Sequence, residues 1–137
     1  MNSITILRIA LGAAAIQYIA YTILFLSAKP KHGQDEINLI NAMKSNRWNF
    51  NGFKRSYWDF YFGYGLLAIL FGIVEIALLW QLSIIPQNFL PIIKPIIVVL
   101  FFANVLHGIL TVKYFFLLPP VFDLVVTILL ALAYFYI

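Results

Sequence analysis

The chain has 137 residues, of which 64% are hydrophobic and only 10% are charged, and its formal net charge is +4. Soluble domains contain about 25% charged residues, so this composition excludes an ordinary water-soluble fold. The absence of cysteine excludes disulfides, thiolate catalysis and the quinone-linked thiol oxidoreductases. The excess of basic over acidic residues could by itself indicate nucleic-acid binding. In so apolar a chain, however, we expect the basic residues to attract anionic lipid headgroups, and we expect no nucleic-acid partner.

Four long apolar segments follow one another along the chain. They cover residues 4–26, 57–82, 95–117 and 121–137. The first three exceed the ~20 residues that a helix needs to cross the bilayer hydrocarbon, and the fourth just reaches that span. They do not alternate between apolar and polar residues as barrel strands do, so each predicts a helix. The sequence therefore predicts an all-α, polytopic membrane protein, a four-transmembrane-helix bundle that forms one domain over residues 1–137.

The ends of these helices are predicted from a few residues. The first segment is expected to be a retained helix rather than a signal peptide, because its apolar stretch is too long and contains Arg8 and Gln17. Proline cannot continue the helical hydrogen-bond pattern, so it marks the predicted breaks before the third and fourth helices. These breaks fall at Pro86, Pro91, Pro95, Pro119 and Pro120.

One long polar segment, residues 27–56, separates the first two apolar segments. Within it, residues 34–48 carry acidic residues at the start and basic residues at the end, the order that complements a helix dipole. Ile37, Ile40, Met43 and Trp48 lie roughly on one side. This pattern predicts a short amphipathic helix lying on the headgroups, with a solvated irregular loop as the alternative.

The distribution of basic residues predicts the orientation. Six Lys and Arg residues lie in the long loop and Lys113 makes seven on that side, against Arg8 and Lys94 on the other. By the positive-inside rule, the long loop faces the cytoplasm and both termini face outward. We therefore expect a multi-pass protein of the cell (inner) membrane.

The first two helices carry matching stripes at helical spacing. The stripes are Arg8, Gly12, Ala15, Ile19 and Thr22 in the first helix, and Tyr61, Gly65, Ala68, Gly72 and Glu75 in the second. Small residues allow membrane helices to approach closely, so antiparallel packing is predicted to place Gly12 on Gly72 and Ile19 on Gly65. It also places Arg8 beside Glu75, as an ion pair that either fixes the register alone or takes part in function.

A second match joins the last two helices. Antiparallel pairing puts Thr111 opposite Asp123, His107 opposite Thr127, and Asn104 near Ala131. An ionisable residue inside a membrane is a functional candidate, so His107 is either a hydrogen-bonding partner between helices or a functional group. Gln17 lies nearly opposite the Arg8 stripe, which favours a contact with the fourth helix or with another chain.

The inward polar residues define a candidate ligand site with apolar and aromatic walls. The set is His107, Glu75, Asp123, Asn104, Tyr61, Tyr64 and Arg8. The tyrosine-rich stretch 57–61 equally suits an interfacial aromatic belt. His32, with Asp35 and Glu36, could hold a metal, but it lacks the second His that zinc would favour, so we expect solvated charge, no metal and no cofactor.

A resemblance adds to this pattern. The residues Arg55-Ser56-Tyr57-Trp58-Asp59-Phe60-Tyr61-Phe62-Gly63-Tyr64-Gly65 resemble the start of the second helix in small bacterial four-helix membrane proteins. More distantly, four helices with inward acids and a His are similar to the sterol-isomerase-like (EXPERA) superfamily. Members of that superfamily bind sterol-like or cationic amphiphiles through membrane-embedded carboxylates. Glu75, Asp123 and His107 match its pattern in residue type, which implies a lipophilic ligand but does not carry over isomerase activity.

Three functions fit these observations. The first is a membrane protein that binds or handles a lipophilic or amphiphilic small molecule in an intramembrane pocket. The second is an isomerase-like enzyme that uses a carboxylate and His107 as acid and base. The third is a scaffold or accessory subunit, or a homo-oligomer, whose contact face would be Ala10, Ala14, Gln17 and Tyr21. A transporter fits least, because four helices show no internal repeat.

Overall fold

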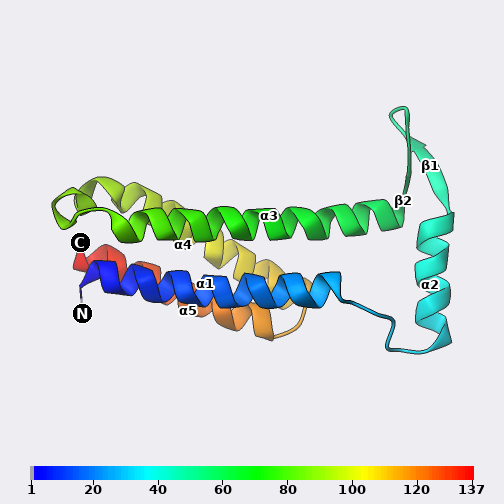
Figure 1. Cartoon of the computed structure of the whole chain (residues 1–137), viewed down its shortest axis with the longest axis horizontal. Helices are drawn as coiled ribbons and strands as arrows, with labels where there is room; N and C mark the ends of the chain where they lie inside the picture. The colour runs from blue at the N-terminus through cyan, green and yellow to red at the C-terminus, as the bar shows by residue number, and fades with distance from the viewer. Residues whose placement is uncertain (1) are drawn as a thin grey trace. The chain divides into compact units, whose positions relative to one another are not determined.

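A computed structural model describes residues 2–137 and shows a mostly helical chain (Figure 1). The helices are α1 (Ser3–Leu26), α2 (Gln34–Ser45), α3 (Tyr57–Ile84), α4 (Leu90–Tyr114) and α5 (Leu118–Tyr136). Strands β1 (Arg47–Phe50) and β2 (Phe53–Ser56) follow α2, and a short 3-10 turn, η1 (Gln87–Phe89), precedes α4. By length and composition, four helices could cross a membrane, and these are α1, α3, α4 and α5. The predicted multi-pass helical plan is confirmed at this level.

Proline begins two helices here instead of ending them. Pro91 lies in the first turn of α4, and Pro119 and Pro120 lie in the first turn of α5. A missing N–H in the first turn costs no hydrogen bond within the helix. Pro95 lies inside α4, which therefore begins five residues before the predicted start. The predicted breaks before the third and fourth membrane helices are present, since α3 ends at Ile84 and α4 ends at Tyr114, but of the five prolines only Pro86 lies outside a helix.

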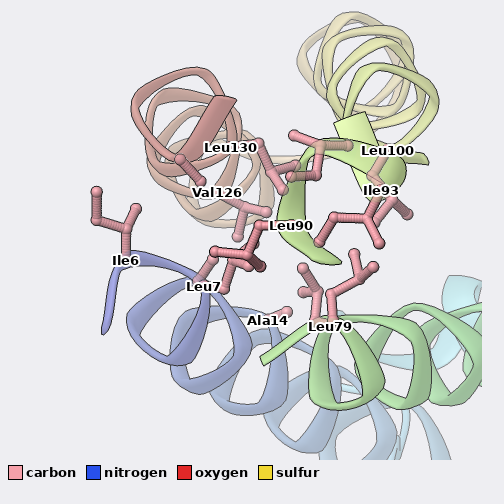
Figure 2. Close-up of a cluster of buried hydrophobic side chains, with 13 residues drawn as sticks. Ile6, Leu7, Ala14, Leu79, Leu90, Ile93, Leu100, Val126 and Leu130 are labelled. Carbon is pink, nitrogen blue, oxygen red and sulfur yellow. The ribbon is translucent and has the colours of Figure 1, made fainter. Parts of the chain in front are cut away.

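The chain divides into two compact units, and the first contains the residues up to Ala20 and those from Gly72 onward. Aliphatic side chains from four helices form its core (Figure 2). Core residues are Ile6, Leu7, Ala10 and Ala14 of α1, Leu79 and Leu82 of α3, Leu90, Ile93, Ile97 and Leu100 of α4, and Val126, Leu130 and Ala133 of α5. Ala10, Ala14 and Gln17 are therefore buried inside their own bundle, so they are not free to contact another chain as the scaffold hypothesis requires.

The predicted register between α1 and α3 is wrong. In the first unit, Gly72 lies under the ring of Tyr18, and a Cβ added at this glycine would be 2.2 Å from a ring carbon. In the second unit, Phe25 covers Gly65 in the same way. Both partners lie six residues beyond the predicted ones, on a different face of α1. Gly65 and Gly72 of α3 make room for aromatic rings, whereas a Cβ on Gly12 would meet nothing within 4 Å.

The second unit covers Tyr21–Phe71 and contains the predicted helix of the polar segment. Helix α2 has Asp35 and Glu36 in its first turn and Lys44 in its last. The carboxylate of Glu36 accepts hydrogen bonds from the backbone N–H groups of His32 and Lys31, and these bonds lower the pKa of Glu36. The helix ends at Ser45, three residues before the predicted end, because the chain then enters a strand.

A β-hairpin replaces the rest of the predicted loop, so the fold is not strictly all-α. Strands β1 and β2 pair antiparallel, with Arg47 opposite Ser56 and Phe50 opposite Phe53. The turn is formed by Asn51 and Gly52, which have φ angles of 50° and 90°. Two successive positive φ angles are the geometry of a two-residue hairpin turn, for which Asn-Gly is the preferred sequence.

Aromatic contacts join the hairpin to the start of α3 within the second unit. Trp48 packs edge-on against Tyr57 at 5.0 Å between ring centroids, and Phe50 packs against Phe60 at 4.9 Å. From α2, the ammonium of Lys44 lies 4.5 Å from the centroid of the Trp58 ring. The stretch 57–61 is thus partly occupied by contacts within its own unit.

The ring of Tyr18 over Gly72 generates a stability prediction. We expect Gly72→Ala to lower the free energy of unfolding by about 1–3 kcal/mol, because the new methyl group overlaps a ring that cannot move without losing its other contacts. Gly12→Ala is the matched control on α1, and its stability should stay unchanged or rise, because alanine favours a helix. Unfolding of both variants would be followed by circular dichroism in detergent. Equal destabilisation by both changes would support the register predicted from the sequence, in which Gly12 and Gly72 face each other.

Candidate functional site

Asp123 joins three helices at one carboxyl group. Helix α5 places this side chain in the interior of the first unit, where it is only 2% exposed. Its Oδ1 accepts a hydrogen bond from Nε2 of Gln17 on α1 at 2.7 Å and lies 3.0 Å from Nδ1 of His107 on α4. Its Oδ2 accepts a hydrogen bond from the hydroxyl of Thr111 at 3.1 Å. The carboxyl is therefore fully engaged by partners from α1 and α4.

The local sequence of α4 explains this meeting. His107 and Thr111 are four residues apart, so they lie on one face of the helix. Gly108 lies between them, and a Cβ added there would come within 3.3 Å of the Cβ of Asp123. A larger residue at this position would hold α5 away from α4, so the missing side chain permits the short hydrogen bonds.

Two sequence predictions concern these contacts and have different outcomes. The pairing of Thr111 with Asp123 is confirmed. The pairing of His107 with Thr127 is wrong, since His107 contacts Asp123 one helical turn earlier on α5. A carboxylate is a stronger hydrogen-bond acceptor than a hydroxyl, which accounts for this choice. Of the two alternatives for Gln17, the contact with the fourth membrane helix is the one that the structure contains.

Glu75 forms a second centre close to the first. Its Oε2 accepts a hydrogen bond from the hydroxyl of Tyr18 at 2.9 Å, and its Oε1 accepts one from Nδ2 of Asn104 at 2.6 Å. Nδ2 of Asn104 also donates to the backbone carbonyl of Leu100, which orients the amide. The predicted ion pair with Arg8 is wrong: the Arg8 side chain is exposed, and the shifted register brings Tyr18 to Glu75 instead.

Tyr18 connects the two centres. Its hydroxyl binds Glu75, and its ring centroid lies 6.5 Å from that of His107. We call the resulting group the acid cluster, and it consists of Gln17, Tyr18, Glu75, Asn104, His107, Thr111 and Asp123. Within residues 2–137, no Lys or Arg forms an ion pair with either carboxyl. With both acids ionised, the cluster has a formal charge of −1 even when His107 is protonated.

The structure brings together four of the seven predicted site residues, namely His107, Glu75, Asp123 and Asn104. Arg8 is exposed, while Tyr61 and Tyr64 belong to the second unit, where Tyr61 packs against Phe25 and Trp58. Gln17 and Thr111 were visible in the sequence as polar residues inside helices. Tyr18 gave no such signal, because tyrosine is common at membrane interfaces.

Two further features complete the description of possible ligand sites. An apolar hollow of about 230 Å³ lies between α4 and α5, and no residue of the acid cluster lines it. Among the described residues, no three His, Asp or Glu side chains gather in an arrangement that could hold a metal ion. His32, which precedes α2, lies 3.2 Å from Glu36 in the first turn of that helix.

Comparison of the chain with known protein families, curated proteins and solved structures finds no match. The function therefore has to be inferred from the chemistry of the acid cluster. The likeness to the sterol-isomerase-like superfamily stays a prediction.

Removal of the Asp123 carboxyl tests whether it joins the helices. We expect Asp123→Ala to lower the free energy of unfolding by roughly 2 kcal/mol, since three side-chain hydrogen bonds are lost at about 0.6 kcal/mol each in membrane proteins. Thr127→Ala removes a polar group one turn further along α5 and should cost well under half as much. Both variants would be compared by reversible unfolding in mixed micelles. A loss at Thr127 equal to that at Asp123 would show that the carboxyl is not the joining group.

Proposed function

We propose that this protein binds a lipophilic small molecule whose polar end carries a positive charge or hydrogen-bond donors, held by the acid cluster. One observation carries the proposal. Two carboxyl groups lie among four helices that could cross a membrane, and within the described chain neither of them is paired with Lys or Arg.

The energetic cost of these carboxyl groups supports a binding role. An acidic side chain at the centre of a membrane helix costs about 2.5–3.5 kcal/mol on insertion scales, so such residues persist mainly where they serve a function. Glu75 accepts hydrogen bonds from Tyr18 and Asn104, and no Lys or Arg of the described residues forms an ion pair with it. A cationic amphiphile would supply a positive charge and place its apolar body among the helices.

His107 offers a route between the cluster and the outside. Its side chain is 42% exposed, whereas that of Asp123 behind it is 2% exposed. One edge of the imidazole is thus held by a buried carboxyl, and part of the ring is accessible. The same superfamily resemblance that implies cationic amphiphiles fits this arrangement, in which a ligand would meet His107 first.

A second function, an isomerase-like enzyme, is favoured by the contact between His107 and Asp123. The 3.0 Å contact between His107 and Asp123 orients an imidazole that could accept and return a proton, as general acid–base catalysis requires. The variant His107→Gln would distinguish binding from catalysis, because glutamine keeps a polar side chain but cannot transfer a proton. Retained binding with lost turnover of a sterol-like substrate would favour the enzyme.

The binding proposal predicts a charge-dependent probe. A photoreactive long-chain tertiary amine should label the purified protein, and a neutral alcohol of the same shape should label it about tenfold less, which corresponds to 1.4 kcal/mol. Glu75→Gln and Asp123→Asn should each reduce labelling by the amine toward the level of the alcohol.

Asp35→Asn is the matched control for that experiment, because it removes an exposed acid at the start of α2, in the second unit. It should label like the unmodified protein. Equal labelling by the amine and the alcohol would contradict the proposal, as would full labelling of both cluster variants that remain folded.

We also propose that the second unit's polar segment, with its six Lys and Arg residues, faces the cytoplasm of a cell (inner) membrane. Because the chain has no cysteine, a single Lys44→Cys variant can report its side. An impermeant thiol reagent should label Cys-substituted position 44 in inverted membrane vesicles and leave intact cells unlabelled. Labelling in intact cells would reverse the orientation.

A further inference from the structure

The hollow between α4 and α5 has walls that suit a hydrocarbon chain. Ile97, Val98, Phe101 and Phe102 of α4 face it, as do four residues of α5 that include Ala131 and Tyr134. No polar surface lines it, and it is only partly enclosed. Its volume of about 230 Å³ lies below the ~300–1,000 Å³ of pockets that enclose a whole small molecule. It therefore fits part of a ligand, such as a stretch of one acyl chain.

A cation, Lys94, lies at one end of this hollow. Lys94 precedes Ile97 by three residues and Val98 by four, so it lies on the same face of α4 as the wall. Its ammonium is 4.8 Å from the ring centroid of Tyr134, which belongs to the wall. Lys94 is the fifth residue of α4, close to the end of the membrane-spanning segment, and within residues 2–137 it forms no ion pair with Asp or Glu.

From this juxtaposition we infer a lipid site, in which the hollow between α4 and α5 holds one acyl chain of an anionic phospholipid and Lys94 binds its phosphate. The charge of the cation at the end of the hollow selects an anionic headgroup. Because the hollow is only partly enclosed, a second acyl chain can stay in the bilayer, which favours a phospholipid over a free fatty acid. This site lies apart from the acid cluster and has the opposite charge.

Lipid titration followed by native mass spectrometry in a mild detergent tests whether Lys94 selects an anionic headgroup. The unmodified protein should bind phosphatidylglycerol about fivefold more tightly than phosphatidylcholine with identical acyl chains, which is the contribution of one Lys near an anionic lipid. Lys94→Gln should abolish that preference, and Lys94→Arg should keep it. Glu75→Gln should leave it unchanged, which separates this site from the proposed function of the acid cluster.

The hollow is tested by filling it. Ala131→Phe places a ring in the hollow and should weaken binding of both phospholipids severalfold, whereas Val99→Phe adds similar bulk at an exposed position of α4 that does not line it. Should Ala131→Phe fail to fold, the Lys94 variants still decide. The inference is overturned by equal binding of the two phospholipids to the unmodified protein, by a preference that survives Lys94→Gln, or by palmitate binding more tightly than phosphatidylglycerol.

Discussion

A carboxyl group buried in an apolar helix bundle must find hydrogen-bond donors, and this requirement organises the first unit. A polar group left without a partner in such surroundings costs several kilocalories per mole. Asp123 meets the requirement by gathering Gln17 from α1 and His107 and Thr111 from α4. The aliphatic core around it has little directional preference, because lipid tails are as apolar as leucine. The hydrogen bonds to Asp123 therefore specify which faces of these helices meet.

Glycine plays two different parts in meeting that requirement. Gly108 leaves room for the side chain of Asp123 against α4, which keeps Thr111 and His107 within reach of Asp123. Gly72 instead receives the ring of Tyr18, and the hydroxyl of that ring then reaches Glu75, three residues further along α3. Tyr18 therefore provides both the ring that packs on Gly72 and the hydroxyl that donates to Glu75. A bulkier residue at position 72 would disturb both.

The helices and one contact of the site could be predicted from the sequence, because length, apolarity and helical spacing are local properties. The pairing of Thr111 with Asp123 followed from two polar residues near one short connection. The register of α1 on α3 could not be predicted, since a glycine stripe does not reveal whether a backbone or an aromatic ring will fill its groove. The hairpin had a local signal, Asn51-Gly52 between aromatic residues, that outweighs the amphipathic pattern continuing from α2.

The two carboxyl groups differ in their burial and in their hydrogen-bond partners. Asp123 is buried and uses both oxygens to join helices, so its place in the fold explains its presence. Glu75 is only half-buried, and its two partners are an uncharged hydroxyl and an uncharged amide. A glutamine at position 75 could accept the hydrogen bond from Tyr18, but its NH2 group would then face the donating amide of Asn104. The two acceptor oxygens of Glu75 therefore connect α3 to both α1 and α4.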